Sequence, residues 1–472
     1  MCNLPLVDRA PVAKVSGNML ISFSVENYRS YRERQTMSLL AEDSRESIAN
    51  TTAILAPALK GRRVLNVAAI YGANASGKSN FIRAFNRLIR IVTTSAKQGT
   101  ENDRLPVTPF ELDDLSKDKP SCFSTTFIIN EVVYVYDVAL SRDRVHSEEL
   151  TAFPKTHPQR LFSRTVSKSG VSTWHFSRTH FRRDPALEMR TRRNSLYVSV
   201  GAVFNHKLLK EIFKFFALAN TRVPLFADQE LLQCSKNESF MAWASKMLAA
   251  ADTGIADIRA KTVDRLVDLP EEIRKTLPEK ALSDLRSQPD LLVSHRKSSG
   301  GETWWPIGRE SDGTRQLLSL LRSWHGILYN GRLAFVDELN DSLHPLLSRR
   351  LLQMLAEVPP GRARGQLIFT THDSTLLDPH LLRRDQIFFT EKSSDGATTL
   401  YSLLDYTPRK DEAMQKGYLA GRYGGIPFFG EFKFEENHKT SADIAEVTAS
   451  PANGRRKKSS PDHSDRVSRQ GD

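Results

Sequence analysis

The segment from Gly72 to Ser79, which reads GANASGKS, carries the residues best suited to chemistry. It matches the pattern G-x-x-x-x-G-K-[ST] in full, with an apolar stretch before it and a helical pattern after it. In this pattern the glycines let backbone N–H groups surround a phosphate, the lysine neutralises phosphate charge, and the final hydroxyl ligates Mg²⁺. The N-terminus of the following helix adds the positive end of its dipole. The segment therefore predicts a binding site for a nucleotide and Mg²⁺.

We expect the whole loop to contact the nucleotide. Lys78 would neutralise the β- and γ-phosphates, and Ser79 would ligate the metal. The candidate nucleotide-binding residues of this loop are Gly72, Asn74, Ser76, Gly77, Lys78, Ser79 and Asn80.

A second pair of candidate residues follows the apolar stretch LAFV at positions 333–336. Asp337 and Glu338 come directly after it, which places both carboxylates at the end of a buried strand. Ligands of open α/β sheets bind at this edge. We expect Asp337 to hold Mg²⁺ and Glu338 to act as the general base that polarises the attacking water.

Two further segments complete the candidate chemistry. His372 ends the strand-like stretch LIFTTH, 34 residues after Glu338 and with one helical pattern between them. This spacing predicts that the strand before His372 lies next to the strand before Glu338. His372 would then reach the γ-phosphate and act as a sensor for it. Ser311 and Gly313 open the next predicted helix upstream, where a hydroxyl, a close backbone approach and free N–H groups suit an anion.

The surrounding pattern predicts the elements that must position these side chains. Polar and apolar residues partly alternate from Leu20 on both sides of NYRSYRERQ, and again over 123–140, which favours antiparallel hairpins. A strand over 64–70 precedes the loop, and Phe81, Phe85, Leu88 and Val92 then recur at helical spacing. Strands at 333–336, 367–370 and 387–389 alternate with helices from 313 onward, which indicates a parallel sheet with right-handed crossovers.

Composition narrows the classes of protein. The chain of 472 residues has a net charge of +12, no apolar stretch long enough to span a bilayer and no signal-like N-terminus. We therefore expect a cytoplasmic protein without a membrane partner. The segment 178–193 holds six arginines and two acids, which suits either a polyanion or an ordinary solvated face. The three cysteines lie too far apart for a metal motif or a disulfide framework.

Together these motifs resemble the ABC-type P-loop ATPases of the SMC and RecF kind. The matching stretches, in order, are NYRSY, GANASGKSN, ESDGT, FVDEL, SLHP and TTHD, and they cover most of 19–430. A closer resemblance is to compact bacterial abortive-infection ATPases of the RloA-like, AriA-like and OLD-like groups. It rests on PFELDD, ESDGTRQL, DELNDSLHP, RRDQIFFTEK and GYLAGRYGGIPFF.

The resemblance implies a set of roles that the residues alone do not establish. Ser311 and Gly313 would cap ATP bound by a second subunit, in a homodimer or larger homo-oligomer. The D-loop, residues Asn340–Leu343, would lie at the dimer seam. Arg29 would contact nucleotide. The signature segment reads ESDGT here, where the family usually has an LSGGQ-like sequence.

The resemblance also implies the fold: an α/β ATPase head with a mixed sheet, an antiparallel β subdomain and an inserted helical subdomain. The expected divisions are an extension over 1–18, two halves of the head over 19–200 and 301–436, a helical insert over 201–300, and a disordered tail over 437–472. No heptad pattern is long enough for a coiled-coil arm, which argues against a ring-forming SMC protein.

The sequence favours an enzyme that hydrolyses ATP to ADP and phosphate and joins its heads when ATP binds. Its setting would be anti-phage defence or a DNA transaction. OLD proteins add a nuclease with a D-x-D motif, and this chain has none, so a nuclease or toxin effector would be a separate partner. A RecF-like DNA-repair ATPase without a defence role fits the same residues. A transporter ATPase subunit fits less well, because the chain is long and its signature differs.

Overall fold

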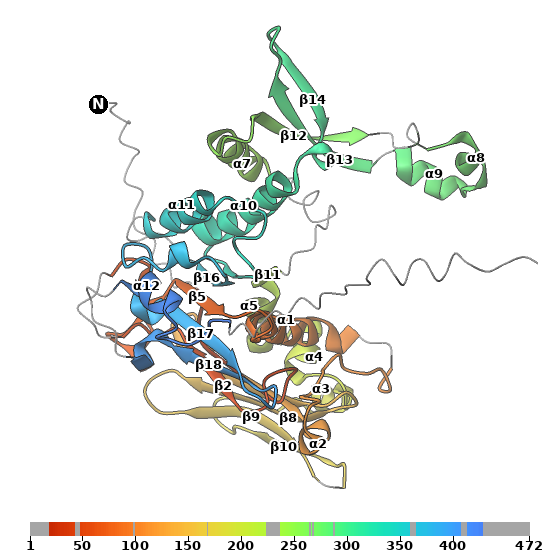
Figure 1. Cartoon of the computed structure of the whole chain (residues 1–472). Coiled ribbons are helices and arrows are strands. Elements are labelled where there is room, and N and C mark those ends of the chain that lie inside the picture. Colours follow the sequence, from red (N-terminus) through yellow and green to blue (C-terminus); the bar gives the residue numbers. More distant parts are fainter. Residues whose placement is uncertain are drawn as a thin grey trace, which may run out of the picture. The chain divides into compact units, whose positions relative to one another are not determined.

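A central, largely parallel sheet carries the predicted phosphate-binding loop (Gly72–Ser79) (Figure 1). The computed structural model describes residues 18–42, 48–97, 100–167, 169–222, 237–263, 266, 269–286, 288–358, 365–406 and 413–427. The sheet has the order β11-β15-β16-β5-β17-β18, and only β18 runs antiparallel to its neighbour. Its strands are β11 (Asn220–Arg222), β15 (Leu333–Val336), β16 (Gln366–Thr370), β5 (Val67–Gly72), β17 (Ile387–Lys392) and β18 (Thr398–Ser402). The predicted α/β class with a parallel sheet is confirmed.

Both faces of this sheet are covered, because alternate residues of each strand point to opposite sides. In β5, Ala68 and Ile70 join one hydrophobic core, whereas Val67, Ala69 and Tyr71 join the other. The first core contains the apolar face of helix α1 (Lys78–Thr94). The second contains helices α10 (Asp312–Asn330) and α11 (Pro345–Ala356).

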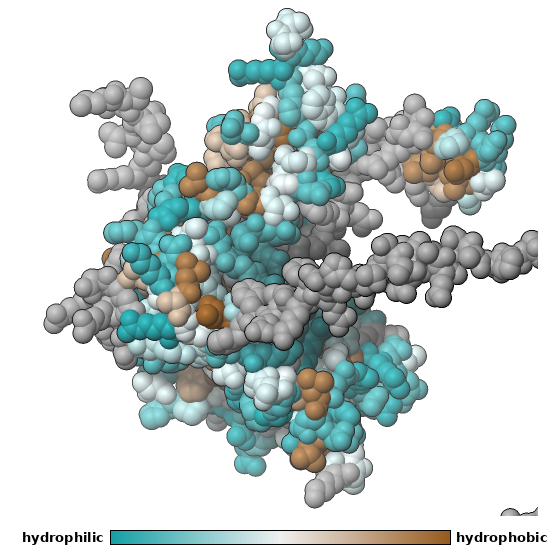
Figure 2. Space-filling model, in the orientation of Figure 1, coloured by the Kyte–Doolittle hydropathy of each residue, from teal (hydrophilic) through white to brown (hydrophobic). Residues whose placement is uncertain are grey.

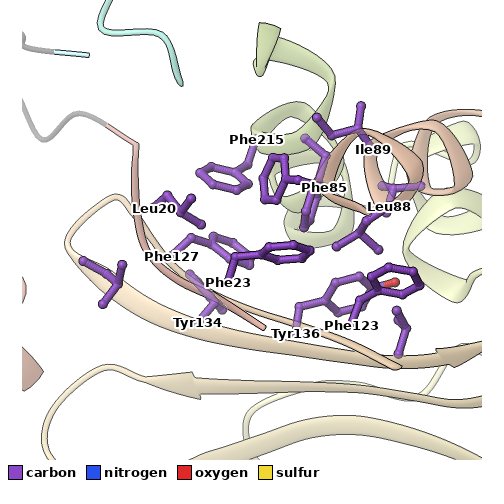
Figure 3. Packing of buried hydrophobic residues seen from close by; sticks show 14 of the residues in the cluster. Leu20, Phe23, Phe85, Leu88, Ile89, Phe123, Phe127, Tyr134, Tyr136 and Phe215 are labelled. Atoms are coloured by element: carbon purple, nitrogen blue, oxygen red, sulfur yellow. The ribbon is translucent and has the colours of Figure 1, made fainter. Parts of the chain in front are cut away.

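A seven-stranded antiparallel sheet forms the other side of the first core. Its order is β10-β9-β8-β7-β6-β1-β2. Figure 3 shows Phe85 and Leu88 of α1 facing aromatic side chains of this sheet, among them Phe23 and Phe127. The strands are β1 (Met19–Glu26), β2 (Gln35–Ser38), β6 (Ser121–Ile129), β7 (Val132–Leu140), β8 (Val145–Phe153), β9 (Gln159–Val166) and β10 (Ser172–Phe176). Both predicted hairpins, β1–β2 and β6–β7, are confirmed.

Buried Gln366 ties the two sheets together. At the start of β16, its side-chain carbonyl accepts a hydrogen bond from the Leu20 N–H at 2.6 Å. Its amide donates to the carbonyls of Leu20 at 2.9 Å and Leu65 at 3.0 Å. A buried backbone group without a partner costs about 1–3 kcal/mol, so these bonds stabilise the contact between the start of β1 and the parallel sheet.

The expectation of a helical insert over 201–300 is correct only in part. Helices are present, but β12 (Ile255–Val263) and β13 (Gln288–Arg296) pair with β14 (Glu302–Pro306) in a three-stranded antiparallel sheet. An irregularity in register between Ile255 and Asp257 leaves the buried Ile255 and Ile258 three residues apart. No local pattern in the sequence encodes the pairing of β12 with β13, because the two strands are separated by helices α8 and α9.

The remaining elements are short. They are β3 (Thr51–Ala53), β4 (Arg63–Leu65), α2 (Asp114–Lys117), α3 (Pro185–Arg190), α4 (Tyr197–Val203), α5 (Lys207–Leu218), α7 (Glu238–Ala250), α8 (Glu271–Thr276), α9 (Glu279–Arg286) and α12 (Met414–Leu419). The strand expected over 64–70 is two strands, β4 and β5. Gly331 ends α10 with a left-handed backbone at φ 60°, a conformation that glycine often adopts at the end of a helix. The predicted tail and all but Asn18 of the predicted extension lie outside the described residues.

Hydrophilic side chains predominate among the coloured residues of the face shown in Figure 2, and hydrophobic ones form small separate spots. The most exposed large hydrophobic residues include Met189, Leu115 and Leu346. Scattered apolar side chains of this kind are normal on a protein surface. Within the described part of the chain, every helix is too short or too polar to cross a bilayer.

Candidate functional site

The carboxyl ends of four neighbouring strands border one pocket. Strands β15, β16, β5 and β17 run in parallel, so they end at the same edge of the sheet. The pocket there has a volume of about 250 Å³. Its lining residues are Asn74, Ala75, Gly77, Lys78, Ser79, Asn80, Arg83, Glu338, His372 and Lys392. The structure thus brings most of the predicted loop together with Glu338 and His372, while Gly72, Ser76 and Asp337 are not among the lining residues.

The loop has a backbone that its glycines make possible. Gly77 has φ 110°, and a Cβ atom there would lie 2.3 Å from the Thr398 hydroxyl oxygen. A side chain at this position would therefore both strain the backbone and clash. Ala75 has φ 62°, which is a strained value for a residue with a side chain. The loop is therefore held in a fixed cradle shape.

Lys78 is buried within the loop. The residue is only 5% exposed, and its ammonium donates hydrogen bonds to the carbonyls of Gly72 at 2.8 Å and Ala73 at 2.9 Å. Burial lowers the pKa of Lys78 to about 8, and the carboxylates of Glu338 and Asp337 partly offset this effect. The ammonium is thus poised where an added anion would stabilise its charged form.

This pKa predicts a pH dependence for nucleotide binding. Bound phosphates favour the charged lysine and raise its pKa, so affinity is highest below pH 8 and falls as pH rises through 8. Between pH 7 and pH 9, calorimetry should show ATP binding weaken about tenfold, with proton uptake on binding near pH 8. Equal affinity at both pH values would show that Lys78 does not contribute its charge. Lys78→Arg, which cannot titrate in this range, is the matched control.

The two acidic residues after β15 are held by the next strand. Asp337 is 4% exposed and accepts a hydrogen bond from the Thr370 hydroxyl at 2.7 Å. The same hydroxyl oxygen accepts from the Glu338 N–H at 2.7 Å. Glu338 has a left-handed backbone with φ 52°, a strained value of the kind that collects at functional sites. Thr370 therefore fixes the turn that directs Glu338 into the pocket.

His372 is positioned by the first residue of the D-loop. The Asn340 side-chain oxygen accepts from the Thr371 hydroxyl at 2.7 Å and from the His372 N–H at 3.4 Å. Burial, followed by the positive charge of Lys78, lowers the pKa of His372, whereas Asp337 acts in the opposite direction. The imidazole is therefore neutral at pH 7, where it can donate one hydrogen bond and accept another.

The donor set suits Mg²⁺. Among the described residues, the Ser79 hydroxyl has no hydrogen-bond partner, and Asp337 has one oxygen that Thr370 leaves free. Both are hard oxygen ligands. Within the same part of the chain, no group of three or more His, Cys, Asp and Glu is arranged to hold a metal. The oxygens of Ser79 and Asp337 suit Mg²⁺, which usually takes one or two protein ligands and completes its shell with phosphates and water.

Ser311 and Gly313 do not line this pocket. Ser311 is exposed and caps α10, accepting from the Thr314 N–H at 3.1 Å. Gly313 lies against the D-loop, since a Cβ atom there would be 2.6 Å from the Ser342 carbonyl oxygen. The signature segment (Glu310–Thr314) and the D-loop therefore form one packed surface of the chain.

Arg29 also lies outside the pocket lining. Its guanidinium stacks over the Tyr28 ring at 5.9 Å, and its backbone N–H donates to the Thr108 carbonyl. The neighbouring Ser30 does reach the loop, because its hydroxyl accepts from the Asn80 side chain at 2.9 Å. A contact between Arg29 and nucleotide stays a prediction.

Two cations in the pocket were missed from the sequence. Arg83 lies one turn beyond Ser79 on α1, so helical spacing alone could have placed it on the same face. Lys392 ends β17, the strand beside β5, and only the strand order reveals that it reaches the loop.

The basic segment 178–193 is largely engaged within the chain. Arg183 pairs with Glu188 at 2.8 Å, and Arg190 stacks over Phe204 at 4.8 Å. Arg193 donates to the Glu101 carbonyl at 3.1 Å. Several arginines of this segment therefore make contacts that stabilise local structure. These contacts make the segment a weaker candidate for binding a polyanion.

Comparison with solved structures finds SMC head domains. One, bound to the C-winged-helix domain of ScpA, is 14% identical with a TM-score of 0.36, covering 81% of this chain and 97% of that one. The SMC head domain from Thermotoga maritima is 10% identical with a TM-score of 0.35, covering 81% and 98%. A Pyrococcus furiosus SMC head with an extended coiled coil, bound to the C-terminal domain of ScpA, is 12% identical with a TM-score of 0.30, covering 83% and 98%.

Comparison with protein families gives the clearer result. The sequence has no significant match among curated proteins. Residues 67–378 match a family model described as "AAA domain, putative AbiEii toxin, Type IV TA system". The matched range contains the phosphate-binding loop, both acids after β15 and His372. Because it spans more than half of the chain, this protein belongs to that AAA-domain family, as its resemblance to abortive-infection ATPases predicts.

Proposed function

We propose that this protein binds and hydrolyses ATP, and that ATP joins two copies of it while hydrolysis separates them. One observation carries the proposal: the glycine-rich loop, the acidic Glu338 and His372 converge in a single pocket at the carboxyl edge of the sheet. Family membership supports nucleotide chemistry at this place.

Each residue of the site has a separate role in the proposed hydrolysis. Lys78 and the loop N–H groups bind the β- and γ-phosphates, and Glu338 takes a proton from the attacking water. Mg²⁺ held by Ser79 and Asp337 would neutralise charge that develops on the phosphates. His372 hydrogen-bonds the γ-phosphate, so its position depends on whether that group is present. Asn340 connects His372 to the D-loop, which gives the site a path to the subunit surface.

The exposed signature segment supports a site completed by a second copy. Ser311 is exposed and caps α10 with its hydroxyl, outside the lining of the pocket in its own chain. Two copies related by a two-fold axis would each place Ser311 and the N-terminus of α10 against the phosphates bound by the other. Such an arrangement makes association depend on the γ-phosphate.

The family description favours defence as the biological setting. In that setting the ATP-joined dimer would hold or release a separate nuclease or toxin. A DNA-repair ATPase of the RecF kind is the alternative, with DNA as the partner. The internal contacts of segment 178–193 give DNA binding less support than its charge suggests.

Nucleotide-dependent association tests this proposal directly. With ATP and Mg²⁺, or with a non-hydrolysable analogue, we expect light scattering to report twice the mass found with ADP or without nucleotide. AMP is the control, because it lacks the phosphates that join the copies. A mass that is the same with ATP, ADP and AMP would contradict the association switch, while phosphate release would still report on hydrolysis.

A further inference from the structure

We propose that Lys392 binds the terminal phosphate of the nucleotide, as a second lysine of the site. This inference rests on the proposed ATP binding and extends it to a residue outside the phosphate-binding loop. Lys392 is exposed, ends β17 and lines the pocket together with Lys78 and His372.

The hairpin that carries Lys392 is fastened to the loop. Lys392 pairs with Thr398 across β17 and β18. The Thr398 hydroxyl donates to the Ser76 carbonyl at 2.8 Å and also bonds the Ser30 hydroxyl at 2.8 Å. Two residues before Lys392, the Thr390 hydroxyl bonds the Ser76 hydroxyl at 2.7 Å. These hydrogen bonds to the loop therefore fix the backbone position from which the Lys392 side chain extends.

A further contact steadies the far end of the hairpin. Asp395, in the turn between β17 and β18, forms an ion pair with Arg32. Arg32 in turn stacks over the Phe110 ring at 5.8 Å. The hairpin is thus held at its base and at its turn, so the Lys392 side chain supplies most of the freedom needed to meet a ligand.

The charges of the pocket favour a polyphosphate ligand, because the cations of the lining outnumber the carboxylates with which they could pair. The lining contains three cations, Lys78, Arg83 and Lys392, but only one carboxylate, Glu338. Among the described residues, Lys392 forms no ion pair. A flexible ammonium with three donors and no partner suits phosphate oxygens at the mouth of a cradle.

The strand order indicates which phosphate Lys392 meets. β5 lies between β16 and β17, so His372 and Lys392 approach the loop from opposite flanks. Lys78 and Glu338 reach the same pocket, where the γ-phosphate is cleaved in the proposed reaction. A phosphate there would lie between the imidazole on one flank and the ammonium on the other.

Lys392→Ala in the full chain should weaken ATP binding about five- to tenfold by calorimetry, as expected for one partly exposed charge-assisted contact. ADP binding should weaken less, and AMP binding should not change. Lys392→Arg keeps the charge and should restore most of the affinity for ATP. Melting temperatures without nucleotide should match the wild type, because Lys392 has no partner to lose within the described chain.

Lys60→Ala, which removes another exposed lysine that does not line the pocket, is the matched control and should bind ATP normally. Unchanged ATP affinity in Lys392→Ala, or equal losses for ATP, ADP and AMP, would overturn the role of Lys392 while leaving the proposed ATPase intact. A wild-type protein that fails to bind ATP would reject the proposed function and this inference together.

Discussion

Glu338→Gln is expected to stop ATP turnover while leaving ATP binding intact. Glutamine keeps the shape of the side chain but cannot accept a proton from water, and loss of a general base typically costs a factor of about 10²–10⁴ in rate. The Glu338 N–H would still donate to Thr370, so the turn after β15 should keep its form. Phosphate release measures the loss, and calorimetry measures the retained affinity.

The same variant should accumulate the ATP-joined assembly. If hydrolysis separates the copies, a protein that binds ATP without cleaving it stays associated, and light scattering should show the larger mass long after ATP is added. Glu357→Gln is the matched control, because Glu357 lies in an exposed ion pair with Arg350 at the end of α11 and should not affect turnover. A Glu338→Gln protein that hydrolyses ATP at the normal rate would show that another group is the base.

The parts of the site that lie directly after a single strand could be predicted from the sequence. The phosphate-binding loop, Asp337 with Glu338, and His372 each come directly after a strand whose apolar run is readable. Parallel strands end at one edge, so three separate segments could be assigned to one pocket before any coordinates were known.

Other features depend on contacts between distant segments. Lys392 reaches the pocket only because β17 lies beside β5, and no local pattern encodes that order. The helical expectation for 201–300 failed where β12 pairs with β13, because that pairing joins segments that are far apart in the sequence. In segment 178–193 the charge was readable, but not the carbonyl and carboxylate partners that engage it. Local chemistry was thus easier to predict than the partner of each side chain.

Lys78→Ala is expected to remove measurable ATP binding. The variant loses a buried ammonium, which is worth about 1.5–3 kcal/mol for each hydrogen bond to a charged group, and it loses the charge that meets two phosphates. A drop in affinity of at least about a hundredfold should follow, measured by calorimetry, with no turnover and no ATP-dependent association. Lys60→Ala again serves as the control. Normal affinity would show that the loop does not bind phosphate.

Mixing two inactive variants tests whether each active site is built from two copies or lies within one copy. Lys78→Ala and Ser311→Arg should each be inactive alone if Ser311 acts on the nucleotide of the other copy. In a mixed dimer, one of the two sites combines an intact Lys78 with an intact Ser311. Half of random dimers are mixed, so the mixture should recover about a quarter of wild-type turnover. If each copy instead held a complete site, Ser311→Arg would stay active alone and adding Lys78→Ala would not raise its activity.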